Sequence, residues 1–352
     1  MRVRDLLLLP LHVAQVATGA KSFAANPIIG SPALNRRGLH VKRVQLAQQL
    51  AERRRSGLTH FLLKEHRDHF TEMGYVSWPG FLPDDVFSKI EDEIAQGNFE
   101  REDMRQGRAV TRRALIDDAE LRERPGLHAA KNDPRLRDAI RFVASYGGEP
   151  LLTLQTVLAA APEADLKTDP QTMLHADTFH PIAKAWLFLR DVGPDDGPFQ
   201  YVPGSHRMTR ERYEWERELS ENPKTIEDVY ARRGSLRVSP DQLNALGYGA
   251  PMLQTVRANT LVVADTHGFH ARSPSPRATT RIEIYGSLRR NPFMPFSLPH
   301  LAALPGLRGQ TDRMASRGMA LRARLGGKGT PWKPIGRGDV FEWPAQLPRV
   351  PD

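Results

Sequence analysis

The chain has 352 residues, of which 40% are hydrophobic and 26% charged, a composition typical of a globular protein with a sizeable core. Lys and Arg number 50 against 41 Asp and Glu, and the resulting net charge of +9 favours anionic partners such as phosphorylated substrates, acidic lipid surfaces or nucleic acid. Cysteine is absent, which excludes disulfides, thiolate metal sites and cysteine nucleophiles. Any transition metal must therefore be held by His, Asp or Glu.

Residues 1–58 are predicted to form an N-terminal extension that ends in an amphipathic helix, "VKRVQLAQQLAERRR". Its opening combines basic residues, an apolar stretch over residues 6–20 and small residues near Ala24. We consider three interpretations: a segment lying in a membrane interface, a segment packed on the domain, and a cleaved signal peptide. Asp5, Pro10 and His12 argue against the signal peptide. No apolar run reaches the roughly 18 residues that a spanning helix needs.

Residues 59–295 have the pattern of a compact domain. The stretch from residue 60 to 97 predicts a helix, a turn at Gly74, the strand "YVSWPGF" and, after the acidic cap "PDD", a second helix. Another helix is predicted over 134–145.

The middle of the chain predicts short strands separated by turns rich in Pro, Gly and Asp, as in an antiparallel sandwich or barrel. The predicted strands cover residues 151–161, 183–192, 199–206, 260–266 and 280–288. Residues 207–250 are highly charged and helical in pattern, which indicates an insertion between strands. Residues 296–352 are rich in Pro, Gly and Arg and are predicted to wrap around the domain.

The motif "HAD" places His175 and Asp177 two positions apart. Residues at this spacing on a strand point the same way, so the two side chains can bind one ion. An oxygen-activating Fe(II) centre is commonly built from two imidazoles and one carboxylate. The second imidazole would come from a distant strand, and the candidates are His267 and His270 in "ADTHGFH".

An arginine beyond this motif would bind the free carboxylate of a 2-oxo acid cosubstrate, since a guanidinium makes bidentate, charge-assisted bonds to carboxylates. Arg281 lies 11 residues after His270, at the head of the predicted strand "RIEIYGSL". The competing pair is His267 with Arg277.

The succession of "HAD", "PFQYVPGSHR", "ADTHGFH" and Arg281 resembles the phytanoyl-CoA dioxygenase family of Fe(II)/2-oxoglutarate-dependent oxygenases. The stretch "FTEMGYVSWPGFLPDDVFSKIEDEI" is similar to the N-terminal module of that family. The resemblance spans about residues 60–292, two thirds of the chain.

The resemblance implies a double-stranded β-helix, a jelly roll with an all-β core flanked by helices (α+β), and a metal at its open mouth. It implies that His175, Asp177 and His270 bind Fe(II) and that Arg281 binds the distal carboxylate of 2-oxoglutarate. With O₂ as second cosubstrate, such an enzyme hydroxylates an unactivated C–H bond and releases succinate and CO₂.

Residues on the flanking strands extend this predicted site. Gln155 and Lys184 are further candidates for cosubstrate binding. His180, Trp186 and Arg289 are candidates for the substrate side.

The basic composition and the apolar, basic N-terminus suggest an anionic lipid-linked substrate, such as a lipopolysaccharide inner-core sugar or an acyl lipid. We expect a cytoplasmic protein with peripheral contact to an anionic membrane surface, on the inner face of the cytoplasmic membrane. A soluble acyl-CoA or a small secondary metabolite is the alternative substrate. A metal-binding jelly roll without catalysis is the alternative outside enzymes, but it would not need Arg281. Nucleic acid is not an expected partner because there is no helix-turn-helix pattern or aromatic basic stripe.

Overall fold

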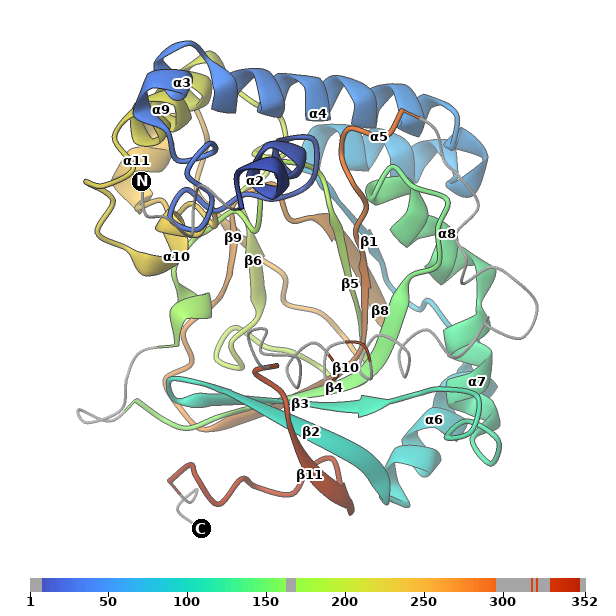
Figure 1. Cartoon of the computed structure of the whole chain (residues 1–352). Helices are drawn as coiled ribbons and strands as arrows, with labels where there is room; N and C mark the ends of the chain where they lie inside the picture. The colour runs from blue at the N-terminus through green and yellow to red at the C-terminus, as the bar shows by residue number, and fades with distance from the viewer. Residues whose placement is uncertain (1–7, 163–168, 296–317, 319–320, 322–329, 349–352) are drawn as a thin grey trace.

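Two antiparallel sheets make up the core of the computed structural model, which describes residues 8–162, 169–295, 318, 321 and 330–348 (Figure 1). The larger sheet contains, in spatial order, β1 (Tyr75–Trp78), β8 (Thr260–Asp265), β5 (Ala183–Phe188), β10 (Thr279–Leu288), β4 (Leu151–Ala159), β3 (Ala109–Leu115), β2 (Phe99–Gln106) and β11 (Lys333–Gly338). The smaller sheet contains β7 (Met252–Leu253), β6 (Phe199–Tyr201) and β9 (His270–Arg272). The predicted jelly roll with flanking helices is confirmed.

The alternation of side chains along β10 separates the core from the pocket. Ile282 and Ile284 lie in the apolar core on the outer side of the larger sheet. Arg281 and Glu283 point to the opposite face, toward the smaller sheet. Glu283 is paired across the ladders with Gln155 of β4. The register of these strands therefore brings polar side chains from neighbouring strands to one place between the sheets.

Four helices cover the outer face of the larger sheet (Figure 1). They are α5 (Lys64–Met73), α6 (Asp84–Ala95), α7 (Pro125–Asn132) and α8 (Pro134–Val143). The helices predicted before and after Gly74 and over 134–145 are thus present. Gly74 ends α5 with a φ of +88°, and a Cβ at this position would lie 2.5 Å from the Tyr201 hydroxyl oxygen. Glycine is required here for both reasons.

The N-terminal segment packs against the predicted insertion rather than extending away from it. Phe23 and Ile29 share an apolar cluster with Ile226 and Leu236 of the insertion. The N-terminal helices are α2 (Leu9–Val16), α3 (Pro32–Arg36) and α4 (Leu39–Ser56), and those of the insertion are α9 (Arg210–Glu221), α10 (Val229–Arg232) and α11 (Pro240–Ala245). Short 3₁₀ helices occur at Thr59–Phe61 and Pro170–Thr172. No described helix has the length and apolar character needed to cross a membrane.

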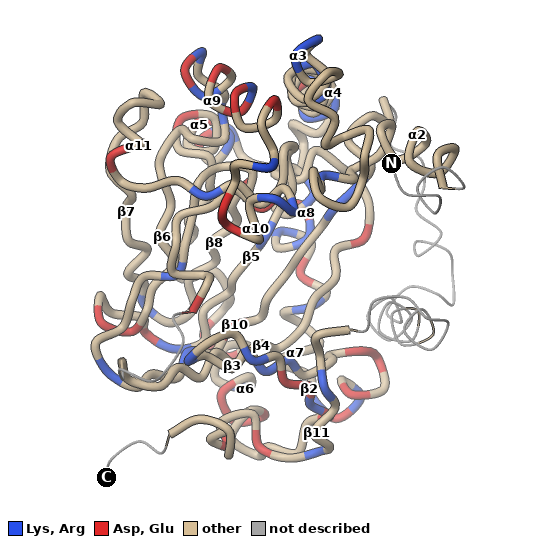
Figure 2. Tube along the Cα trace, turned by 60° about the vertical axis from the view of Figure 1, so that its left-hand side comes forward, with Lys and Arg blue, Asp and Glu red and all other residues tan. Residues whose placement is uncertain are grey.

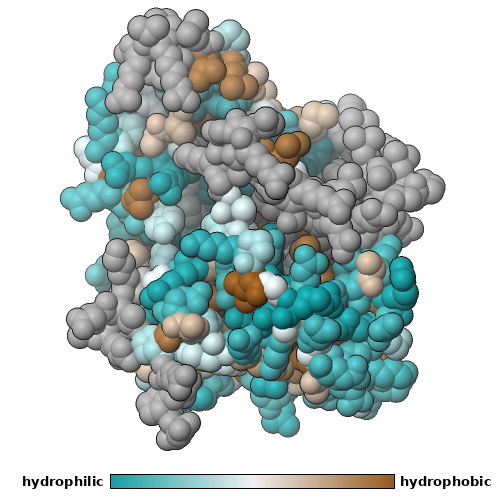
Figure 3. Space-filling view, turned by 60° about the horizontal axis from the view of Figure 1, so that its bottom comes forward, coloured by the Kyte–Doolittle hydropathy of each residue, from teal (hydrophilic) through white to brown (hydrophobic). Residues whose placement is uncertain are grey.

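Strands β2, β3 and β11 are absent from the sequence prediction. Their inward positions carry charge: Arg112 of β3 binds Asp103 of β2 at 2.9 Å, and both side chains are buried. A buried ion pair hides the alternation of apolar and polar residues by which strands are recognised. The C-terminal segment adds β11 to the edge of the sheet, whereas the rest of its predicted wrapping course, over most of residues 296–329, lies outside the described residues. The face at this end of the molecule is mostly hydrophilic (Figure 3).

Candidate metal centre

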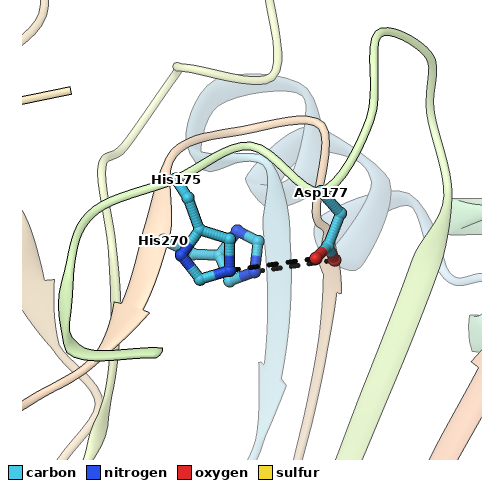
Figure 4. A group of neighbouring side chains, drawn as sticks. All are labelled: His175, Asp177 and His270. Atoms are coloured by element: carbon cyan, nitrogen blue, oxygen red, sulfur yellow. Dashed lines mark ion pairs between the residues drawn. The ribbon is translucent and has the colours of Figure 1, made fainter. Parts of the chain in front are cut away.

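Main-chain pairing between distant segments places His175, Asp177 and His270 together. The His175 N–H donates to the His270 carbonyl at 2.9 Å, and the His270 N–H donates back at 3.0 Å. The two residues are therefore directly opposite each other, with their side chains on one face. Asp177, two positions after His175, is held by its own N–H, which donates to the Thr266 carbonyl at 2.9 Å. Figure 4 shows the three side chains converging.

The three side chains fit a transition metal. One ligand atom from each lies within 4.8 Å of the other two. Nδ1 of His175 bonds to the Met173 carbonyl at 2.7 Å, and Nδ1 of His270 bonds to the Gly268 carbonyl at 2.9 Å. A carbonyl only accepts, so each Nδ1 carries the proton and each Nε2 keeps a lone pair for a metal. Nε2 of His270 is buried and has no hydrogen-bond partner among the described residues.

Burial and neighbouring charges together keep the candidate ligands in their metal-binding protonation states. It lowers the pKa of His175 to about 3 and the pKa of His270 to about 4, so both rings are neutral near pH 7. Burial alone would raise the pKa of Asp177, but Lys184 and the two histidines hold this pKa well below its usual range. Two neutral imidazoles and one carboxylate are the donor set of non-haem Fe(II) sites.

Lys184 contacts the candidate ligands directly. Its Nζ lies 2.6 Å from Oδ2 of Asp177, because β5 places it on the face of the larger sheet that looks toward the smaller one. Burial disfavours its charge, yet Asp177 raises its pKa above the ordinary value. The sequence predicted Lys184 as a cosubstrate contact, and the structure makes it a partner of the Asp177 carboxylate in a position that also lines the pocket.

The two histidines open into a pocket of about 210 Å³ between the sheets. Arg281 lines it and is fixed by two contacts: its Nε donates to Glu283 at 3.1 Å, and its Nη1 donates to the Gly197 carbonyl at 2.6 Å. Gln155 donates to the other oxygen of Glu283 at 2.9 Å. The wall is lined by Met104, Gln106, Thr111, Gln155, Gln171, His175, Lys184, Trp186, Phe199, His270, Ala271, Arg272, Arg281, Tyr285 and Trp332.

Arg272 also lines the pocket, although it was not predicted from the sequence. It lies two positions after His270 on β9 and binds Asp169 at 2.8 Å. Burial lowers its pKa, as does the nearby charge of Arg281, while Asp169 raises it. The spacing of two along a strand was the available signal, since it puts Arg272 on the same face as His270.

The competing pair His267 and Arg277 is not brought to the triad. His267 is fully buried, and its Nδ1 bonds to the Thr178 carbonyl at 2.9 Å. Arg277 is mostly exposed and binds Asp196 at 2.5 Å. Neither residue lines the pocket of the triad.

The three substrate-side candidates lie in different places. Trp186 lines the pocket, with its ring centroid 4.3 Å from that of Phe199. His180 does not reach the pocket wall: it is buried, and its ring lies under Gly19 of the N-terminal segment. Arg289 is exposed just beyond the end of β10.

A jelly roll in which two histidines and a carboxylate converge beside a pocket is the arrangement found in non-haem Fe(II) oxygenases. The model of the family described as phytanoyl-CoA dioxygenase (PhyH) matches residues 70–240, a segment that includes His175 and Asp177 and ends before His270. The resemblance seen in the sequence is confirmed. In its family match and in the side chains of this site, the protein is similar to 2-oxoglutarate-dependent dioxygenases, the enzyme class predicted from the sequence.

Several solved structures are similar to this chain. The epimerase SnoN from nogalamycin biosynthesis, in complex with Fe³⁺, alpha ketoglutarate and nogalamycin RO, is 17% identical, with 69% of this chain and 90% of that chain covered and a TM-score of 0.42. HygX from Streptomyces hygroscopicus, with nickel, 2-oxoglutarate and hygromycin B bound, is 18% identical, with 70% and 95% covered and a TM-score of 0.41. No curated protein matches the chain.

Proposed function

We propose that the protein hydroxylates an unactivated C–H bond of an anionic substrate, with His175, Asp177 and His270 holding Fe(II) and Arg281 binding 2-oxoglutarate. The observation that carries this proposal is the convergence of three ligand atoms within 4.8 Å, beside a pocket that also contains Arg281. When bound, Fe(II) supplies the redox chemistry by which O₂ converts C–H to C–OH while 2-oxoglutarate becomes succinate and CO₂.

The residues of the chain fix the geometry before any ligand arrives. Backbone carbonyls orient both imidazoles, so that neither ring must turn to present Nε2. Lys184 holds the Asp177 carboxylate in its ionised form. Glu283 orients Arg281, whose guanidinium offers paired donors to a carboxylate. Such preorganisation reduces the free energy lost when metal and cosubstrate are ordered in the pocket.

Anaerobic Fe(II) titration and 2-oxoglutarate consumption test this assignment together. We expect H175A and D177A to lose both metal retention and turnover, because each removes a metal ligand. A variant that still consumes 2-oxoglutarate at the wild-type rate would show that the ligand assignment is wrong.

We further propose that the substrate is lipid-linked, for example a lipopolysaccharide inner-core sugar or an acyl lipid, and is met at an anionic membrane surface. The support is α2, which exposes Leu9, Leu11 and Val13 at 37%, 52% and 55% on a chain of net charge +9. Exposed apolar residues on a helix, together with basic charge, favour an interfacial position.

Flotation with anionic vesicles tests the membrane proposal. The intact protein should float, and the triple variant L9S/L11S/V13S should not. If the intact protein also fails to float, the membrane proposal is wrong, and a soluble acyl-CoA or small metabolite becomes the better substrate candidate. The metal assignment does not depend on this result.

A further inference from the structure

Arg237, in the insertion, is an immediate neighbour of the candidate metal ligands. The Ala176 N–H donates to the Leu236 carbonyl at 2.9 Å, and the Val238 N–H donates to the Leu174 carbonyl at 3.0 Å. These bonds flank an antiparallel bridge between His175 and Arg237.

In such a non-hydrogen-bonded pair the Cα atoms are about 4.5 Å apart and the side chains lie close together on one face. Arg237 therefore points to the same face as His175 and His270. His175 bridges His270 on one side and Arg237 on the other. Arg281 contacts Gly197, just before β6, which pairs with the other side of β9. The two arginines thus lie on opposite sides of the candidate ligands.

The guanidinium of Arg237 is held firmly and is left with an unused donor. Its Nε donates to Asp228 at 3.2 Å, and it lies 4.7 Å from the ring centroid of Tyr230. The side chain is only 6% exposed. Its Nη1 is buried and has no hydrogen-bond partner among the described residues. A buried charged donor without an acceptor is costly, which points to a ligand that supplies one.

Lys21 brings a second cation to the same place from the N-terminal segment. Its Nζ donates to the main-chain carbonyl of Asp177, between the candidate ligands and the insertion. The segment before it is fixed by Arg43, whose guanidinium donates to the carbonyls of Val16, Thr18 and Ala20 at 3.0, 2.9 and 2.7 Å. These contacts hold the segment that carries Lys21 in a fixed position beside the candidate ligands.

The surroundings of Lys21 carry more positive than negative charge. Burial lowers the pKa of Lys21 to about 8, and Asp177 opposes this shift, while the charges of Arg289, Lys184 and Arg237 add to it. All of these cations are thus close enough to Lys21 to repel it. Asp177 already pairs with Lys184. Within the described part of the chain, no carboxylate forms an ion pair with Lys21 or Arg289.

We propose that Lys21 and Arg237 form the recognition site for an oxyanion group of the primary substrate, a phosphate or a carboxylate, separate from the site of the 2-oxoglutarate carboxylate. This inference rests on the proposed function and names the part of the substrate that the protein recognises. Because Arg237 is the cross-strand neighbour of His175, an oxyanion held there keeps the rest of the substrate beside the metal. The two segments that supply Lys21 and Arg237 lie outside the strands of both sheets, so substrate recognition is added to the jelly roll by its extensions.

Binding of inorganic phosphate, and of acetate in parallel, tests this proposal on the full-length protein loaded with Fe(II) and 2-oxoglutarate without oxygen. Calorimetry should show that K21M and R237Q each weaken binding of the preferred anion by about 10-fold or more, the usual effect of losing a hydrogen bond to a charged group. R237K keeps the positive charge but loses the paired N–H donors of the guanidinium, so its affinity for the anion should lie between those of the wild type and R237Q. K42M and R232Q are matched controls, because each removes one exposed charge from α4 or α10.

Four results separate the outcomes. Stronger binding of phosphate assigns a phosphorylated substrate, and stronger binding of acetate assigns a carboxylate. If neither anion binds the wild type, or if K21M and R237Q behave as their controls do, the inference is overturned. If the two variants instead weaken the binding of 2-oxoglutarate, the two cations bind the cosubstrate, and the inference is also overturned. Retained Fe(II) binding in these variants shows that the metal assignment stands independently and that the proteins are folded.

Discussion

The two sides of the candidate metal centre differ in how completely their cations are paired with carboxylates. On the side of Arg281, each arginine has a carboxylate partner: Glu283 binds Arg281 and Asp169 binds Arg272. On the other side, Arg237 also pairs with a carboxylate, Asp228, but its Nη1 has no hydrogen-bond partner, and no carboxylate forms an ion pair with Lys21, within the described residues. A balanced pair is preorganised for a cosubstrate common to the enzyme class. A cation without a carboxylate partner favours a ligand that brings its own negative charge.

The two sides also have different structural origins. The Arg281 side belongs to paired strands of the two sheets. The other side depends on the N-terminal segment and the insertion, which are joined through a buried ion cluster. Glu216 of α9 accepts from Arg212 at 2.9 Å and lies 2.8 Å from Nε2 of His40 on α4. Acidic and basic residues alternate along α9 (Figure 2), but Arg212 and Glu216 are the buried members.

The largest expected effect separates the two candidate histidines. H270A should reduce metal affinity by more than about 100-fold, since it removes a ligand, whereas removing an outer hydrogen-bond partner typically costs 10- to 100-fold. H267A should leave metal affinity within a few-fold of wild type, because His267 bonds to Thr178 instead. Anaerobic metal titration of both variants decides. If H267A loses the metal and H270A retains it, His267 is the metal ligand and Arg277 becomes the candidate for binding 2-oxoglutarate.

Removing the charge of Glu216 should break the connection between the two added segments. We expect E216Q to lower the free energy of unfolding by about 3–5 kcal/mol, because it leaves the buried Arg212 without its counter-charge. Urea unfolding measures this loss. E214Q is the matched control on the same helix, since Glu214 forms an exposed pair with Arg210 that should contribute little. Equal effects of the two variants would contradict a structural role for the buried cluster.

On the balanced side, R281Q should weaken 2-oxoglutarate binding by about 10- to 100-fold while Fe(II) binding is retained, because a charge-assisted bond is lost but no metal ligand changes. Calorimetric titration with 2-oxoglutarate gives the number. R277Q removes an exposed arginine from the loop just before β10 and should have no effect. Unchanged 2-oxoglutarate affinity in R281Q would remove Arg281 from the proposed site.

The smallest effect concerns buried histidines on each side. Burial lowers the pKa of His180, under the N-terminal segment, and of His206, beside α5, to about 3. The ordinary value of about 6.5 applies to the unfolded chain, which therefore takes up protons first as the pH falls. Stability is thus fully present above pH 6.5 and is lost toward pH 3, by about 1.4 kcal/mol per pH unit for each histidine.

Urea unfolding at several pH values between 6.5 and 5 gives the dependence of the free energy of unfolding on pH. In H180Q and in H206Q this dependence should be weaker by the uptake of one proton on unfolding. If H206Q reduces the slope and H180Q does not, the N-terminal segment releases His180 to solvent in mild acid. The two sides of the molecule would then differ in stability as well as in charge.

Much of the site can be predicted from the sequence because its signals are local. A spacing of two places His175 and Asp177 on one face, and the strand pattern of β10 aligns Arg281 with the pocket. The main strands and the helices at 64–73, 84–95 and 134–143 follow from hydrophobic periodicity and turn residues. The order of the motifs sufficed to indicate the family.

Only the tertiary structure decided which distant residues meet. His270 rather than His267 stands opposite His175 because of strand register, and a shift of one residue would turn every side chain to the other face. Lys21 and Arg237 approach the candidate metal ligands from positions 156 residues before and 60 residues after Asp177, and no local sequence pattern predicts that approach. Strands β2 and β3 could not be predicted from the sequence for a related reason. Their buried charged side chains are stable only because they form ion pairs with each other across the two strands. Hydrophobic periodicity can be read directly from the sequence, whereas contacts between distant residues form only when the chain folds.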